Sequence, residues 1–110
     1  MTHTGHENRI LEDGTPVCLL CNRPVPAYAK SSVHHLIPKL KGGKGGPTAI
    51  LHQICHNEIH ATLTEAELAR DFHTAETLQA HPHLAGFIKW LSNKPANFHA
   101  RSRKSLRRRR

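Results

Sequence analysis

The sequence predicts an α+β fold, in which a small ββα unit held together by a metal ion is followed by C-terminal helices and a basic tail. Two short apolar runs, "SSVHHLIP" and "AILHQ", are typical of strands, and "ICHNEIHATL" has the composition of a helix. Hydrophobic residues make up 37% of the 110 residues and aromatic residues only 5%. One small core is therefore expected, and a structural metal would compensate for the modest apolar burial.

The first segment, residues 1–14, is interpreted as an N-terminal arm. It is polar, it has neither helical nor strand periodicity, and it lacks the apolar centre of a signal peptide. The three cysteines of the chain cannot all pair in disulfides, which favours a reducing cytoplasm. No run of about 18 apolar residues occurs, so no membrane partner is expected.

The metal-stapled ββα core is expected at residues 15–63. In "TPVCLLCNRPVP" three prolines surround a cysteine pair, which favours a tight turn over a helix. The first strand should stop at Pro38, before the loop "KLKGGKGGPT". Four glycines make this loop adaptable, and it carries three cations suited to phosphate contacts, Lys39, Lys41 and Lys44.

Residues 64–98 are expected to be helical and to belong to the same domain. Thr64 and Glu67 form a capping-box pattern, and a shorter helix is predicted around "TAETLQA". Pro82 suits the first turn of a third helix. Four apolar residues of this helix have the spacing i, i+3, i+4, i+7 and are expected in the core: Leu84, Phe87, Ile88 and Leu91. Trp90 is also expected to be a core residue of this helix.

A structural zinc site is predicted from two pairs of ligands with equal spacing. Cys18-x2-Cys21 offers two thiolates from one turn, and His52-x2-Cys55 completes a closed Cys3His set. The alternative is that Cys55 is a small buried hydrophobe, that His52 lies on the surface and that "CLLC" is a coincidence. A redox pair is a further possibility, but its usual βαβ context is absent.

Four other histidines suggest a second, open metal site. His56 and His60 are four residues apart, so they share one face of a helix. His34 and His35 are consecutive on a strand and must point to opposite faces, so that one can bind metal and the other can act as a base. Chance adjacency is the alternative, since the chain has 11 histidines. The remainder are expected to be surface or capping residues: His3, His6, His73, His81, His83 and His99.

The order "CLLC", "HHLIPK", glycine-rich loop and "LHQICHNEIH" resembles the HNH endonucleases of the ββα-metal superfamily, in the subgroup with a CxxC…CxxC zinc site. The match covers roughly residues 16–62. The resemblance implies DNA nicking, one strand per active site. It also implies that His35 is the general base, and that His34, His56 and His60 hold a catalytic divalent ion such as Mg²⁺ or Mn²⁺.

Two positions depart from the family pattern. His52 stands where the family usually has Cys, which keeps a good zinc ligand. The family's middle Asn, which orients the base, should fall near residue 47, where this chain has Pro47 and Thr48. Asn57 and Thr48 are the candidates for that orienting role.

The basic tail, residues 99–110, carries most of the charge. The formal net charge is +8, but "RSRKSLRRRR" holds seven of the 16 Lys and Arg and none of the eight acids, which leaves nine cations against eight acids elsewhere, or +1. Alone, this tail is expected to be disordered, and against DNA it would bind phosphates without reading sequence. Its cations are Arg101, Arg103, Lys104, Arg107, Arg108, Arg109 and Arg110.

Other functions stay open at this stage. The tail could instead serve solubility or targeting. A zinc-stabilised nucleic-acid-binding module without catalysis is the main alternative, favoured by Pro47, and an RNA-binding or ribosome-associated protein would explain the tail but not the four histidines. No organic cofactor is expected. A double-strand break would need two active sites, so the choice between monomer and dimer is open.

Overall fold

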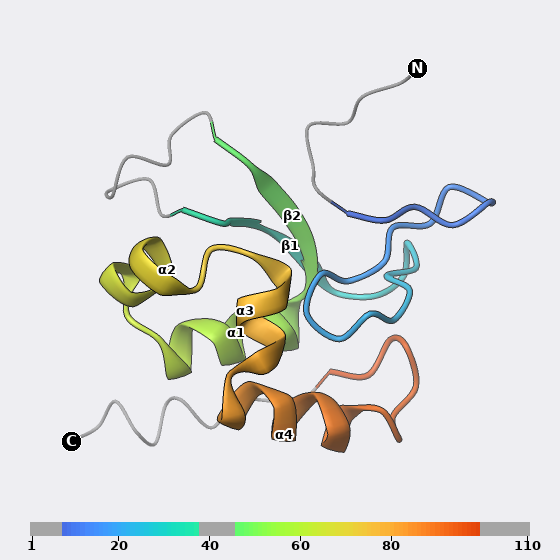
Figure 1. Ribbon diagram of the computed structural model, residues 1–110. Helices are drawn as coiled ribbons and strands as arrows, with labels where there is room; N and C mark the ends of the chain where they lie inside the picture. Colours follow the sequence, from blue (N-terminus) through green and yellow to red (C-terminus); the bar gives the residue numbers. More distant parts are fainter. Residues whose placement is uncertain (1–7, 38–45, 100–110) are drawn as a thin grey trace.

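A two-stranded antiparallel sheet runs directly into a helix in the computed structural model, which describes residues 8–37 and 46–99 (Figure 1). The strands are β1 (Ser31–His35) and β2 (Thr48–His52), and α1 (Gln53–Thr62) follows β2 without a loop. Ser31 pairs with His52 at one end of the sheet and His35 pairs with Thr48 at the other. The predicted α+β class and the order strand, strand, helix are confirmed.

Three further helices follow, α2 (Glu65–Asp71), α3 (Ala75–Ala80) and α4 (Pro82–Leu91). The predicted capping box is present at α2, because Thr64 N–H donates to Glu67 Oε1 at 2.8 Å and Glu67 N–H donates to Thr64 Oγ1 at 3.1 Å. Pro82 occupies the first turn of α4, and the His81 side chain caps it by accepting from the backbone N–H of His83. The three helices predicted within residues 64–98 are confirmed.

The core lies where α1 packs on the sheet and α4 packs on α1 and α3. It is mostly leucine, with side chains from the cysteine turn, β2 and all four helices; fully buried examples are Leu20, Leu51, Leu68, Leu78, Leu84 and Leu91. Leu84 and Leu91 are thus core residues as predicted, while Phe87 and Ile88 are partly buried against the cluster.

The prediction that Trp90 lies in the core of α4 is wrong, because the residue is 47% exposed. Leu91 faces inward, and one helical step turns the side chain by about 100°, which places Trp90 at the edge of the buried stripe. There it contacts the rings of Phe87 and Phe98, and the Lys94 ammonium lies 4.9 Å from its ring centroid. The structure therefore gives α4 an aromatic and cationic outer edge.

The cysteine turn is closed by backbone hydrogen bonds. Cys18 N–H donates to Arg23 O at 2.8 Å, and Asn22 N–H donates to Cys18 O at 3.0 Å. Asn22 has φ 61°, a left-handed conformation that asparagine tolerates better than most residues. This tight turn, as predicted, brings the sulfur atoms of Cys18 and Cys21 close together.

Two side chains join the cysteine turn to the helical part of the chain, one from α3 and one from the turn itself. Gln79 of α3 donates through Nε2 to the carbonyls of Leu19 and Leu20, at 2.9 and 3.2 Å. Arg23 donates through Nη1 to Leu91 O at 3.0 Å and through Nη2 to Lys94 O, so its guanidinium caps the end of α4. The turn and the helical part thus form one hydrogen-bonded unit.

Asn8 adds a pairing partner to the outer edge of β2. Its Oδ1 accepts from Ile50 N–H at 2.6 Å, and its Nδ2 donates to the carbonyls of Ile50 and Val17 at 2.9 and 2.7 Å. The side-chain amide therefore satisfies both backbone groups of Ile50 that face away from β1.

Several predicted residues fall outside the described ranges. These are the loop lysines Lys39, Lys41 and Lys44 and the tail cations from Arg101 to Arg110. Within residues 8–37 and 46–99, no helix combines the length and the apolar character needed to cross a membrane.

We expect Arg23→Ala to lower the free energy of unfolding by about 1.5–3 kcal/mol, because it removes charge-assisted hydrogen bonds to two carbonyls at the end of α4. The matched control is Arg70→Ala, whose ion pair with Asp71 joins side chains that are 68% and 52% exposed; solvent screens such a pair, so its loss should destabilise the protein less. Urea unfolding of the zinc-loaded variants, followed by circular dichroism, measures both. Equal costs would contradict the tethering role of Arg23.

Candidate metal centres

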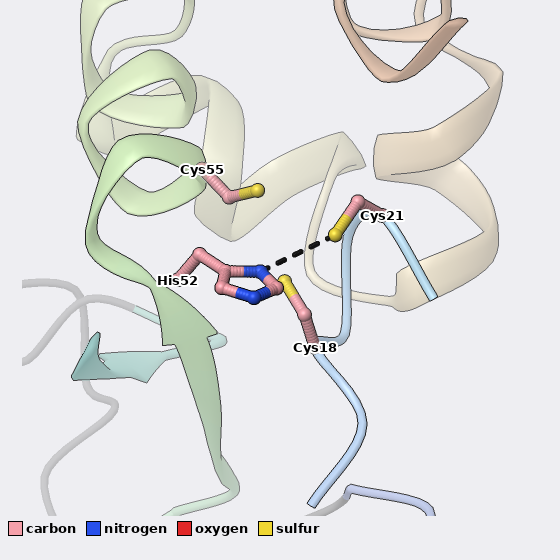
Figure 2. Close-up of side chains that lie close together, drawn as sticks. All are labelled: Cys18, Cys21, His52 and Cys55. Atoms are coloured by element: carbon pink, nitrogen blue, oxygen red, sulfur yellow. Dashed lines mark hydrogen bonds between the residues drawn. The ribbon is translucent and has the colours of Figure 1, made fainter. Parts of the chain in front are cut away.

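The four residues of the predicted zinc site lie together in the structure. Cys18 and Cys21 come from the cysteine turn, and His52 and Cys55 from the junction of β2 and α1 (Figure 2). One potential ligand atom from each lies within 4.8 Å of all the others, and all four residues are buried. This Cys3His cluster is therefore closed to solvent and could hold a metal ion such as zinc.

The strand-to-helix junction gives the second pair its geometry. His52 is both the last residue of β2 and the residue before α1, while Cys55 lies in the first helical turn. The His52 ring presents Nδ1 to Cys21 Sγ at 3.3 Å, and its Nε2 lies 2.9 Å from the Pro24 carbonyl. When Nε2 donates its proton to that carbonyl, the lone pair of Nδ1 faces the sulfurs, as a metal ligand requires.

The protonation of this cluster favours a cation at its centre. Burial raises the pKa of the Cys18 thiol, but hydrogen bonds with Cys21, Cys55 and His52 outweigh it, and the pKa lies well below the ordinary value. Hydrogen bonds with Cys18 and Cys21, together with burial, raise the pKa of Cys55. Burial lowers the pKa of His52, yet the two thiol partners raise it to about 10. Protons on His52 and Cys55 thus balance a thiolate, and a metal ion would replace them.

A second cluster consists of His34 from β1 and His56 and His60 from α1. One ligand atom from each lies within 4.8 Å of the other two. The ring centroids of His34 lie 5.1 Å from His56 and 5.4 Å from His60, and those of His56 and His60 are 4.9 Å apart. His34 is buried, His56 is partly buried and His60 is exposed. In contrast to the Cys3His cluster, this group opens toward solvent.

His34 is the member of this cluster whose environment calls most clearly for an ion. The residue is 1% exposed, and among the described residues neither of its ring nitrogens has a hydrogen-bond partner. Burial, followed by the nearby His56, His60 and His35, lowers its pKa to about 3, so the ring is neutral near pH 7 and offers a lone pair. Because an unsatisfied buried nitrogen is costly, a bound cation would remove a penalty that the fold otherwise bears.

Of the two candidates for orienting the predicted base His35, only Thr48 lies opposite it in the sheet. His35 is not part of the three-histidine cluster; it lies at the end of β1 directly opposite Thr48 on β2, so these two side chains share a face of the sheet. Asn57 accepts a hydrogen bond from Gln53 one turn earlier on α1, at 2.9 Å. The strand register therefore favours Thr48 over Asn57 as the neighbour of His35.

Two contacts near the clusters were not predicted from the sequence. The Ser32 hydroxyl lies 2.5 Å from Nδ1 of His56, and His83 Nε2 lies 2.5 Å from the carboxylate of Glu58. Ser32 shares a strand face with His34 because the two are two positions apart on β1, and this is the one local pattern that could have indicated its position. The contact of Glu58 with His83 joins α1 to α4 and gives His83 a partner beyond the expected surface role.

The sequence of the chain is similar to that of the "Uncharacterized protein YisB" of Bacillus subtilis (strain 168). The two are 38% identical over 89 residues, which cover 81% of this chain and 86% of YisB. The chain belongs to the YisB family. No protein-family model and no solved structure matches the chain. YisB-family membership alone assigns no activity.

We expect His52→Ala to release zinc at least about tenfold faster than wild type, equivalent to about 1.4 kcal/mol, because three thiolates remain where four ligands are needed. His52→Cys should retain zinc, since a thiolate replaces the lost nitrogen. Zinc release to a chromogenic chelator measures the rates, with His73→Ala as the control at an exposed histidine. Equal retention by His52→Ala would remove His52 from the ligand set.

Acid should destabilise the protein through His34. Its pKa is about 3 when folded and near 6.5 when unfolded, so the unfolded chain binds more protons between these values and stability falls as the pH falls. Urea unfolding at pH 7 and at about pH 4.5, without added divalent ions, should show a loss for wild type that exceeds the loss for His34→Gln by on the order of 2 kcal/mol. The variant keeps the Cys3His cluster, so the acid sensitivity of that cluster cancels in the comparison. Identical losses would contradict the prediction.

Proposed function

We propose that this chain is a metal-dependent endonuclease of the HNH type, with a ββα-metal core, which hydrolyses phosphodiester bonds in DNA and cuts one strand per active site. The observation that carries the proposal is the cluster of His34, His56 and His60. His34 lies on β1, and the next residue of that strand is His35. These residues come from a hairpin and the helix that follows it, the order of elements that the HNH resemblance implies.

The donor set indicates which ions the site would take. Three imidazole nitrogens suit Mn²⁺, Co²⁺, Ni²⁺ or Zn²⁺, whereas Mg²⁺ prefers oxygen ligands. We therefore favour a transition metal over Mg²⁺ as the catalytic ion. When bound, the ion would supply positive charge to the scissile phosphate and to the departing 3′ oxygen.

His35 is proposed as the general base. An imidazole has an ordinary pKa near neutrality, so it can accept a proton from water as the water attacks the phosphorus. Thr48, directly across the sheet, is proposed to orient the His35 ring in place of the asparagine that the family carries. The ion bound by the three histidines would hold the scissile phosphate. The metal ligand His34 and the base His35 would thus act from consecutive positions of β1.

DNA is the proposed partner because of how the charge is distributed. Residues 1–100 carry a formal +1, whereas the ten that follow add seven cations. Such a segment would bind any polynucleotide by releasing counterions, with an affinity that falls as salt rises. The loop lysines Lys39, Lys41 and Lys44 are proposed as further phosphate contacts between β1 and β2. Selection of a particular sequence does not follow from these groups.

A plasmid-nicking assay tests the proposal. Wild type should convert supercoiled plasmid to the open-circular form with Mn²⁺, and chelation should stop it. His35→Ala should lose at least about 100-fold in rate, the usual contribution of a general base, while zinc content and unfolding free energy stay at wild-type values. His73→Ala, at an exposed histidine away from both clusters, is the matched control and should nick normally. Equal nicking by wild type and His35→Ala would overturn the assignment of the base.

A zinc-stabilised nucleic-acid-binding module is the second candidate, favoured by the Pro47-Thr48 pair where the family has asparagine. This function requires the Cys3His cluster and the basic tail but no catalytic ion. The nicking assay separates the two candidates, because a binding module would bind DNA in a salt-sensitive way and cleave none with any divalent ion.

A further inference from the structure

Ser32 and His34 occupy the same face of β1. They are two residues apart on a strand, so both side chains point toward α1, which packs on the sheet. Ser32 is partly buried, and its hydroxyl oxygen lies 2.5 Å from Nδ1 of His56. A single strand face therefore supplies one imidazole of the cluster and a hydroxyl that contacts another.

This contact bears on how His56 can bind an ion. An imidazole that ligates through one nitrogen carries its proton on the other, and the group that accepts this proton fixes both the tautomer and the ring plane. In the structure the Nδ1 side of His56 faces the Ser32 oxygen, so an ion in the cluster would be bound through Nε2. A hydroxyl accepts the Nδ1 proton without adding charge to the site.

We propose that Ser32 is a positioning residue of the three-histidine site, whose hydroxyl accepts the Nδ1 proton of His56 and holds the ring with Nε2 directed at a transition-metal ion. This inference rests on the proposed function, in which that cluster binds the catalytic ion. It assigns the orientation of the His56 ring to a strand residue outside the three-histidine cluster.

The need for such a residue follows from the positions of the three rings. His34 is immobilised by burial, at 1% exposed, whereas His56 is partly buried and His60 is exposed on α1. A ring at an open face pays rotamer entropy when it binds an ion, and a hydrogen bond made beforehand reduces that cost. Ser32 would thus orient, before an ion binds, the ring of His56, whose burial is intermediate between that of His34 and that of His60.

The test measures metal binding separately from cleavage. Protein with Zn²⁺ in the Cys3His cluster is titrated with Co²⁺, and the visible absorption of Co²⁺ bound to nitrogen ligands reports occupancy and geometry. Ser32→Thr and Ser32→Val form a matched pair, since both side chains are β-branched and suit a strand but only threonine keeps the hydroxyl. Ser31→Ala, at an exposed position on the opposite strand face, controls for loss of a serine.

The expected result is that Ser32→Val binds Co²⁺ about 10- to 100-fold more weakly than wild type and with an altered spectrum, whereas Ser32→Thr and Ser31→Ala stay within a few-fold. Zinc content and circular dichroism should match in all of them. If Ser32→Val binds Co²⁺ as tightly as Ser32→Thr, with the same spectrum, the positioning role is overturned.

The outcomes for Ser32 and for the nuclease can be told apart. Wild type that binds Co²⁺ with the Thr/Val difference but nicks no plasmid would support the role of Ser32 and count against the endonuclease. Wild type that nicks plasmid, with equal Co²⁺ affinity in Ser32→Thr and Ser32→Val, would do the reverse. Wild type that binds no Co²⁺ beyond the Cys3His cluster would overturn both.

Discussion

The convergence of Cys18, Cys21, His52 and Cys55 is the constraint on which the rest of the architecture depends. Two of these ligands belong to a turn and two span the point where β2 becomes α1, so an ion among them fixes the direction in which the helix leaves the sheet. Structural zinc typically contributes about 10–16 kcal/mol, as much as or more than the whole net stability of an ordinary domain. A zinc ion of this kind would compensate for the limited apolar burial of a small leucine core.

That constraint also determines the second cluster. Cys55 and His56 are consecutive on α1, and one helical step of about 100° directs them to different sides. The sulfur-rich side is fully enclosed, while the imidazole side grades from buried His34 to exposed His60. One short helix therefore contributes ligands to two groups that could each hold an ion, and the two differ in chemistry: mainly thiolates in the first, and imidazole nitrogens in the second.

The features that the sequence predicted correctly are those set by local spacing. The pairs Cys18/Cys21 and His52/Cys55 repeat one interval, the Thr64 capping box lies within a single turn, and consecutive histidines on a strand must diverge. What escaped prediction joins distant elements: Ser32 meets His56, Glu58 meets His83, and Arg23 meets Leu91 across 68 positions. No periodicity encodes such contacts, because they depend on how finished elements pack. The prediction for Trp90 was wrong because it also depends on packing: α4 buries a narrower stripe of side chains than its apolar composition suggests. The roles of the clusters in catalysis stay predictions.

The amide of Asn8 has a consequence for self-association. A strand with unsatisfied backbone groups along one side is a template on which another chain can add a strand of its own. Here the outward N–H and carbonyl of Ile50 are already taken by a side chain from the start of the protein. Growth of the sheet through β2 is blocked at its middle residue, so copies of this protein that meet edge to edge must do so elsewhere.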